Sequence, residues 1–223
     1  MYSFERYMEK RDALRMSIAD AALKMFELLP WNDITRVIDM GCGTGVMALM
    51  LARRHNVVIT CVDRDEGSLE ALRNNSIHSG TDDRIEICHM DLRDVSSPEN
   101  YFDMIISEGS VQIIGFENAL GKWEGMVRKG GYLLIHTDSL EREKREMAIS
   151  SNGYELMATA TITANEWLRL YIGPLMDLIR SISCAGTKDA QLIEQLEQDW
   201  KDMSNAIGDA DKMESVLYLC KKG

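Results

Sequence analysis

The segment Val37-Ile-Asp-Met-Gly-Cys-Gly-Thr-Gly45 contains residue types whose spacing suits a ligand-binding turn. Its apolar start indicates a buried strand, which runs into Gly41, Gly43 and Gly45. Where a parallel strand ends and a helix begins, backbone amides converge, and a ligand that comes close needs residues without side chains. Asp39 stands where a buried strand normally has Val or Ile, so we expect its carboxylate to orient the turn and hold the ammonium group of a zwitterionic ligand. A strand-end cap is the structural alternative.

Two further acids follow the next two apolar runs. Asp63 ends the second run, and an acid about 20 residues after a glycine turn accepts both ribose hydroxyls in dinucleotide sites. We therefore expect Asp63 to hold a ribose, with Arg64 beside the attached base. Asp91 follows the third run, where its carboxylate would accept from the exocyclic amine of an adenine while Leu92 contacts the ring. Each acid taken singly is also an ordinary turn residue.

The ends of the fourth and fifth apolar runs carry the candidates for chemistry. Ser107 and Glu108 end the fourth run, and we expect Glu108 to contact the ligand, to position an acceptor or to remove its proton. A turn acid at a helix N-terminus is the alternative for Glu108. Gln112 is expected to line a polar pocket. His136 is a second candidate base, with a hydrogen-bonded core histidine as its alternative.

Strand and helix patterns alternate along the first two thirds of the chain. Short runs rich in Val, Ile and Leu indicate strands covered on both faces, at 36–40, 57–62, 84–89, 102–107 and 132–137. Helical patterns lie between them, at 45–54, 66–79, 116–127 and 139–151. This alternation predicts a parallel sheet with helices on its faces.

The two ends of the chain depart from this alternation. Helical periodicity runs from Ser3 to Leu29 and stops before Pro30. Near the C-terminus we expect strand 154–161, helices 164–183 and 188–206, a polar linker at 208–212 and a final strand 215–220. A long helical insertion before the last strand predicts a cap over the sheet.

Together these segments resemble the class I, Rossmann-like S-adenosylmethionine (SAM) dependent methyltransferases over about residues 37–137. The likeness rests on the glycine segment, on Asp63 and Asp91, on Phe102-Asp-Met-Ile-Ile-Ser107, and on Met126-Val-Arg-Lys-Gly-Gly131 with the strand after it. It implies an α/β fold with a doubly wound, seven-stranded, mostly parallel sheet whose last strand is antiparallel. The length of 223 residues predicts a single domain. In it we expect residues 1–30 to form a helical lid, 31–138 the cofactor-binding core and 162–210 a helical cap.

The resemblance further implies direct SN2 transfer of a methyl group from SAM, which leaves S-adenosylhomocysteine and requires no metal ion. Gly41, Cys42 and Gly43 are then expected to contact the cofactor, and Asp63 its ribose. The full set of expected cofactor contacts is Asp39, Gly41, Cys42, Gly43, Gly45, Asp63, Arg64, Asp91, Leu92, Ser107 and Glu108.

The methyl acceptor is expected to be a small molecule. Adenine and amino-group methyltransferases tend to carry Asn or Asp, then Pro-Pro and an aromatic residue, after the fourth strand, whereas this chain has Ser107-Glu-Gly-Ser110. The expected acceptor contacts are Tyr7, Arg11, Gln112, Trp167 and Tyr171. Ordinary helix packing is the alternative for those in the helical regions.

The composition points the same way. A net charge of −11 and a pI near 4.9 repel phosphate backbones and anionic lipid surfaces, so we expect neither nucleic acid nor a membrane as partner. Five scattered cysteines without metal-ligand spacing indicate reduced thiols in the cytoplasm and no metal site. We find no apolar stretch long enough for export or anchoring. The sequence leaves open whether the chain is a monomer or a homodimer.

Three other functions fit parts of the pattern. An NAD-dependent oxidoreductase also has a glycine turn and a downstream acid, but its turn is usually Gly-x-Gly-x-x-Gly, and Val46 stands at the last glycine position here. A catalytically inactive SAM-binding or scaffolding subunit would keep the cofactor carboxylates. A protein methyltransferase would differ in its acceptor alone.

Overall fold

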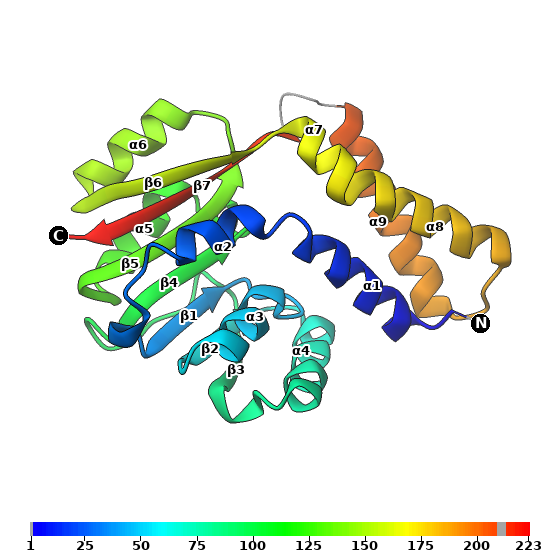
Figure 1. The fold of residues 1–223 in the computed structure, drawn as a ribbon, viewed down its shortest axis with the longest axis horizontal. Helices are drawn as coiled ribbons and strands as arrows, with labels where there is room; N and C mark the ends of the chain where they lie inside the picture. The colour runs from blue at the N-terminus through cyan, green and yellow to red at the C-terminus, as the bar shows by residue number, and fades with distance from the viewer. Residues whose placement is uncertain (1, 209–212) are drawn as a thin grey trace. The chain divides into compact units, whose positions relative to one another are not determined.

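A computed structural model describes residues 2–208 and 213–223 of the protein (Figure 1). Most of the polar linker expected at 208–212 lies outside the described residues. Contacts within the chain divide it into a helical unit, Met1–Lys24 with Thr161–Ser215, and a sheet unit, Met25–Ala160 with Val216–Gly223. In the described part of the chain, no helix combines the length and the apolarity that crossing a bilayer requires.

Seven strands form one sheet in the order β3-β2-β1-β4-β5-β7-β6. Their bounds are β1 Arg36–Met40, β2 Val58–Asp63, β3 Ile85–His89, β4 Phe102–Glu108, β5 Val127–Asp138, β6 Tyr154–Ile162 and β7 Ser215–Lys222. The pairings of β3 with β2, β2 with β1, β1 with β4 and β4 with β5 are parallel, and β7 runs opposite to β6 (Figure 1). The predicted doubly wound, mostly parallel sheet with an antiparallel last strand is therefore confirmed.

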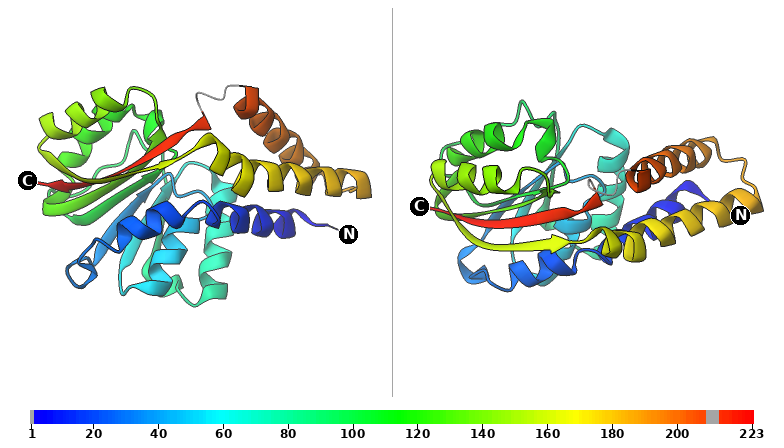
Figure 2. Two further views of the ribbon diagram at one scale, coloured as in Figure 1. Left: turned by 45° about the horizontal axis from the view of Figure 1, so that its top comes forward. Right: turned by 90° about the horizontal axis from the view of Figure 1, so that it is seen from above.

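The side chains of β1 show how the sheet divides its two faces. Successive residues of a strand point to opposite faces, and Ile38 and Met40 share an apolar core with residues of α5 (Phe116–Glu124) and α6 (Arg142–Ser151). Figure 2 shows α5 and α6, in green, on one face of the sheet, and α3 (Val46–Arg54) and α4 (Glu66–Ser79), in blue to teal, on the other. Asp39 therefore points away from the α5 and α6 core.

β5 begins five residues earlier than its apolar run predicts. Its register with β4 shifts between Phe102 and Met104, as at a β-bulge. Gly130 has a φ of +70°, and a side chain on Gly131 would come within 2.8 Å of the Asp103 carbonyl oxygen. Gly130 and Gly131 thus form an irregular part of β5.

The helical unit contains α1 (Phe4–Met16), α7 (Ala164–Trp167), α8 (Gly173–Ala185) and α9 (Ala190–Gly208), while α2 (Asp20–Phe26) continues into the sheet unit. The helical pattern expected from Ser3 to Leu29 is thus divided into two helices. A π-helical turn, Leu168–Ile172, interrupts the helix expected at 164–183. A side chain on Gly173 would come within 2.8 Å of the Leu168 carbonyl oxygen, so this turn needs a glycine. The unit has an apolar core of its own; its role as a lid and cap stays a prediction.

Candidate functional site

Three carboxylates and an imidazole lie on one face of the sheet, at the carboxyl ends of four adjacent strands. Asp63 on β2 and Glu108 on β4 each come two residues after the direct partner of Asp39 on their strand. His136 on β5 is the direct partner of Glu108. Because directly paired residues, and residues two apart, share a face, Asp39, Asp63, Glu108 and His136 all point away from the α5 and α6 core.

Asp39 is the most deeply buried of these acids, with 2% of its surface exposed. Burial, followed by the negative charges of Glu108 and Asp63, raises the pKa of its carboxyl to about 8. A positive group placed among the three carboxylates would lower this pKa and bind the ionised form. The local electrostatics therefore favour a cationic ligand.

The Asp63 carboxylate accepts hydrogen bonds from two backbone amides and can still accept hydrogen bonds from a ligand. Its Oδ2 accepts from the Gly43 amide at 2.8 Å, and its Oδ1 accepts from the Asp65 amide at 2.9 Å. A carboxylate oxygen has two lone pairs, so each oxygen can accept one more hydrogen bond. Asp63 is half-buried, and it can therefore accept from a pair of neighbouring hydroxyls such as those of a ribose.

The amides of the glycine turn are already used within the protein. Gly41 and Cys42 both donate to the Val62 carbonyl oxygen, at 2.8 and 3.0 Å, and Gly43 donates to Asp63. Turns that bind pyrophosphate direct such N–H groups at the ligand. The first three amides of this turn instead donate to oxygens of the protein, and the nearby carboxylates suit a cation better than a phosphate.

Position 41 requires a glycine because Ser110, in the segment after β4, packs closely against it. The φ of Gly41 is +78°, and a side chain here would collide with Ser110, whose Cβ would lie 2.4 Å away. The Ser110 hydroxyl bonds that of Ser107 at 2.8 Å and donates to the Met40 carbonyl oxygen. Ser107, expected to contact the cofactor, thus lies on the opposite face to Glu108 and ties β4 to β1.

The other two glycines of the turn differ in their surroundings. Gly43 has a φ of +52°, and a Cβ built on it meets no described atom within 4 Å, so this residue borders open space. Gly45 has a φ of +80° and precedes α3, where a Cβ would meet the end of the Leu72 side chain. Both keep the left-handed backbone that glycine adopts without strain.

Cys42 supplies backbone rather than a nucleophile. A hydrogen bond with Cys61, then burial and the neighbouring Asp39, raise the pKa of its thiol. The thiol therefore stays protonated and unreactive at neutral pH. Among the described residues, no group of three or more His, Cys, Asp or Glu side chains is arranged to hold a metal ion.

Glu108 and His136 form a pair at the ends of β4 and β5. Glu108 Oε1 lies 3.9 Å from His136 Nδ1, and the two side chains are 29% and 9% exposed. A carboxylate at this distance can orient the imidazole ring. The pair therefore presents a carboxylate oxygen and an imidazole nitrogen side by side to a group that reaches the site.

The expected adenine contacts lie at the end of β3 and have partners of their own. Asp91 accepts from the Arg93 guanidinium through both oxygens, at 2.8 and 2.7 Å. These bonds keep the pKa of Asp91 well below its usual range. Leu92 is buried beside Gly41, and Arg64 is exposed and lowers the pKa of Asp91 further. An adenine amine would have to use the lone pairs of Asp91 that Arg93 leaves.

Gln112 lies in the short loop after β4 and lines a cavity of about 290 Å³ in the sheet unit. The cavity is also lined by Thr137 on β5 and by Lys144 and Arg145 on α6. Because Thr137 directly follows His136, it points to the other face of the sheet. Gln112 therefore opens onto a polar space on the face opposite to the Glu108 and His136 side chains.

The other four expected acceptor contacts all lie in the helical unit, near a buried acid. Tyr7 is fully buried and donates to Asp199 at 2.7 Å, and Arg11 lies 3.6 Å from the same carboxylate. Tyr171 hydrogen-bonds Arg11, and its ring lies 5.9 Å from that of Trp167. The Tyr7 hydroxyl thus donates a hydrogen bond to Asp199, and this cluster of side chains contributes to the packing of the helical unit.

Asp199 is the residue of this cluster that the sequence analysis missed. It is 6% exposed and lies on the buried side of α9, with Leu192 and Leu196. The spacing of these three residues, i, i+4 and i+7, is that of one helix face. The apolar periodicity could therefore have identified Asp199 as a buried acid.

Residues 37–131 match a protein-family model described as a methyltransferase domain, and this segment contains Asp39, the glycine turn, Asp63 and Glu108. This segment of the chain is therefore similar to known methyltransferase domains. A solved structure of a SAM-dependent methyltransferase from Geobacter sulfurreducens, in complex with S-adenosylhomocysteine, is similar with a TM-score of 0.65. It is 18% identical, and the match covers 85% of each chain. The likeness to this structure shows the shared fold.

Curated relatives match over shorter segments. One, from Phocaeicola vulgatus, is named tRNA1(Val) (adenine(37)-N6)-methyltransferase and is 32% identical over 150 residues, which are 64% of this chain and 57% of the relative. Another with the same name, from Klebsiella pneumoniae (strain 342), is 29% identical over 109 residues, 48% of this chain and 44% of the relative. The chain spans about half the length of the curated relatives it matches.

These names correct the expected partner. The acid-rich composition and the absence of Pro-Pro after β4 predicted a small-molecule acceptor and excluded nucleic acid. That prediction is wrong, because curated relatives of this chain are named as enzymes that modify an adenine of tRNA. The error arose because net charge averages over the whole surface, whereas nucleic acid binds to local groups.

Proposed function

We propose that this protein binds SAM and transfers its methyl group. The observation that carries the proposal is the combination of three carboxylates on one face of the sheet with a glycine turn whose amides are already used. SAM presents a sulfonium and an ammonium group, whereas NAD presents a pyrophosphate. The sheet edge is electrostatically suited to the former.

The residues present fit the parts of SAM one by one. Asp63 would accept from the two ribose hydroxyls with the lone pairs that its backbone contacts leave. Asp39 would ionise to hold the ammonium group, and Gly43 leaves space beside it. When bound, SAM would supply an electrophilic methyl group, which a nucleophile would attack in line with S-adenosylhomocysteine as the leaving group.

Glu108 and His136 are the groups we propose to act on the acceptor. They occupy the ends of β4 and β5, next to Asp39 on β1, and share its face of the sheet. Glu108 would position the attacking atom, and His136 would accept the proton that a hydroxyl or amine loses. Holding the acceptor in line and excluding water would supply most of the acceleration.

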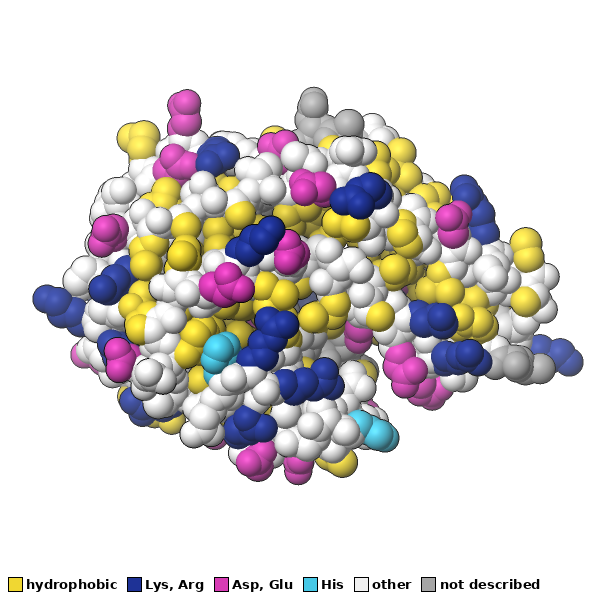
Figure 3. Space-filling model, viewed as in Figure 1, with side chains coloured by type: hydrophobic (Ala, Val, Ile, Leu, Met, Phe, Trp, Pro, Cys, Tyr) yellow, Lys and Arg dark blue, Asp and Glu magenta, His cyan; other side chains and the backbone are white. Residues whose placement is uncertain are grey.

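For the acceptor class we propose RNA, because the curated relatives are named for modifying tRNA. This chain has Ser107-Glu-Gly-Ser110 after β4, without the Pro-Pro-aromatic sequence of adenine methyltransferases, so Glu108 would contact the target base here. On the face drawn in Figure 3, basic side chains lie between acidic and apolar ones. An RNA would be bound through such local groups rather than through the net charge.

SAM binding is tested by isothermal calorimetry of the full chain. Asp63→Ala should lower the affinity for SAM by about tenfold or more, because hydrogen bonds to a charged group contribute ~1.5–3 kcal/mol each. The affinity of Asp63→Asn, which keeps the shape of the side chain, should lie between those of the wild type and Asp63→Ala. The matched control is Asp82→Ala, an exposed acid outside the site. Binding of NADH in preference to SAM, or equal affinity in Asp63→Ala, would show the assignment to be wrong.

Methyl transfer is tested with tritium-labelled SAM and total tRNA. The expected result is label in RNA that ribonuclease releases, and loss of that label in Glu108→Ala at saturating SAM. Label in protein or in small molecules instead would overturn the RNA proposal. SAM binding without transfer to any fraction would favour an inactive SAM-binding subunit.

A further inference from the structure

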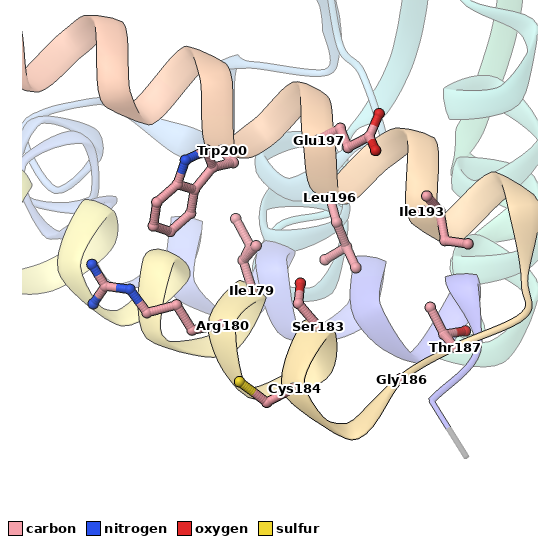
Figure 4. A pocket seen from close by; sticks show the side chains of 10 residues that line it. All are labelled: Ile179, Arg180, Ser183, Cys184, Gly186, Thr187, Ile193, Leu196, Glu197 and Trp200. Atoms are coloured by element: carbon pink, nitrogen blue, oxygen red, sulfur yellow. The ribbon is translucent and has the colours of Figure 1, made fainter.

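The helical unit contains a cavity between α8 and α9, and none of its lining residues is among those proposed above for methyl transfer (Figure 4). Its volume is about 620 Å³, which falls among the volumes of small-molecule sites, ~300–1,000 Å³. The 186–189 segment that joins the two helices borders one end of it. All of its lining residues belong to the helical unit.

The walls of this cavity are mainly apolar. Ile179 on α8 and Leu196 on α9 face each other across it, and Ile193 and Trp200 extend the α9 wall by about one turn in each direction (Figure 4). Ile193 is 39% exposed, a large value for an isoleucine. Ile179 and Leu196 are already buried, so a ligand would remove apolar surface from water mainly by covering Ile193 and the half-buried Trp200.

One charged group lies at the Trp200 end of the cavity. The Arg180 guanidinium lies 5.2 Å from the centre of the Trp200 ring and 3.3 Å from Asp177 on its own helix. The pair with Asp177 is exposed and therefore weak, and a guanidinium has five N–H donors to offer. Glu197 also borders the cavity, but its carboxylate points away from Arg180 (Figure 4).

We propose that this cavity binds a medium-chain carboxylate. The alkyl chain would lie between Ile179, Leu196 and Ile193, and the carboxylate would accept from Arg180 in place of Asp177. The planar guanidinium suits a two-point contact with a carboxylate. The Ser183 hydroxyl, on the α8 wall, borders the middle of the cavity.

The probes are octanoate and its uncharged counterpart octan-1-ol, titrated into the full chain and followed by calorimetry. Octanoate should bind the wild type more tightly than octan-1-ol does. Arg180→Met should lower the affinity for octanoate by about tenfold, the effect of one lost charged hydrogen bond, and leave octan-1-ol unchanged. The matched control is Arg73→Met, because Arg73 also pairs with an acid three residues before it on an exposed helix face.

A second pair of variants tests the location. Ser183 is exposed and lines the cavity, so Ser183→Phe should fill it and lower the affinity for both probes. Ser181→Phe, on the same helix and also exposed but outside the lining, should bind as the wild type does. Circular dichroism checks that each variant is folded. If Ser183→Phe does not fold, the affinities of Arg180→Met for the two probes decide the proposal.

Three results would overturn the proposal. No binding of octanoate to the wild type would remove the site. If the wild type bound octanoate and octan-1-ol equally tightly, and Arg180→Met left both affinities unchanged, Arg180 would not bind the carboxylate. Equal affinities in Ser183→Phe and Ser181→Phe, both folded, would mean that the probes bind elsewhere.

Discussion

Asp39 is buried among groups that oppose its negative charge. Burial, then Glu108 and Asp63, raises its pKa to about 8, whereas an unfolded aspartate has a pKa of about 3.9. Between these two values the folded chain holds a proton that the unfolded chain releases. The contribution of Asp39 to stability is therefore fully present below about pH 4 and is lost as the pH rises through about 8. A residue suited to hold a cation thus destabilises the ligand-free protein at neutral and alkaline pH.

The substitution Asp39→Asn isolates this effect. Because the amide cannot ionise, the melting temperature of the variant minus that of the wild type should rise between pH 5 and pH 9. The gain should reach several degrees, since ~1 kcal/mol shifts a chain of this size by about 2–4 °C. The variant should also bind SAM more weakly at pH 8. Thermal unfolding by circular dichroism measures the difference, with the exposed Asp33→Asn as control. A difference that does not change with pH would contradict the assigned ionisation.

At the scale of the elements, a buried hydrogen bond joins α1 to α9. Tyr7 is fully buried, and this burial, followed by its hydrogen bond to Asp199 at 2.7 Å, raises the pKa of the tyrosine. Gln195 and Arg11 also contact Asp199, at 3.1 and 3.6 Å. Removing one partner leaves a buried charge with fewer contacts, which costs more than the hydrogen bond itself contributes.

Tyr7→Phe should therefore lower the free energy of unfolding by about 1–3 kcal/mol. Denaturant titration measures the change, and Tyr2→Phe, a less buried tyrosine of the same unit, is the control. The double variant with Asp199→Asn should lose less than the two single losses added together, because the residues are in direct contact. Strict additivity would mean that the two helices are held by other contacts.

The sequence predicts the regular elements of the sheet unit because their apolar runs have the period and length of covered strands. It also predicts that acids collect at the carboxyl edge, since Asp63 and Glu108 end their strands and Asp39 is the last residue but one of β1. The occupied amides of Gly41 and Cys42 could not be predicted, because they depend on the position of the Val62 carbonyl oxygen on another strand. Tertiary packing likewise decides where β5 begins.

The helical unit was harder to predict because helical periodicity gives no long-range partners. The π-helical turn depends on Gly173, whose close approach to the Leu168 carbonyl oxygen is a local geometric fact that periodicity does not encode. The residue types of Tyr7, Arg11 and Tyr171 favour contacts with an acceptor. The structure adds that the Tyr7 hydroxyl donates to Asp199, which their residue types do not predict. Their contact with an acceptor stays a prediction.

At the scale of the whole molecule, each unit has a hydrophobic core of its own. The core of the sheet unit contains residues of β1, β4, β5, α5 and α6, and that of the helical unit contains residues of α1, α8 and α9. A chain whose parts have separate cores need not unfold in a single two-state step. The proposed SAM contacts Asp39, Asp63 and Glu108 all belong to the sheet unit. A ligand bound there stabilises the unit that holds it.

We therefore expect two thermal transitions by differential scanning calorimetry, one shifted by a substitution in the helical unit and the other by SAM. Tyr7→Phe should lower only the transition of the helical unit, because its hydrogen bond joins two helices of that unit. SAM at about 100 times its dissociation constant should raise the transition temperature of the sheet unit, because it adds ~2.7 kcal/mol to the free energy of unfolding of that unit. Circular dichroism of Tyr7→Phe with and without SAM separates the two effects. A single transition whose calorimetric and van't Hoff enthalpies agree, shifted by both changes, would mean that the two cores melt as one.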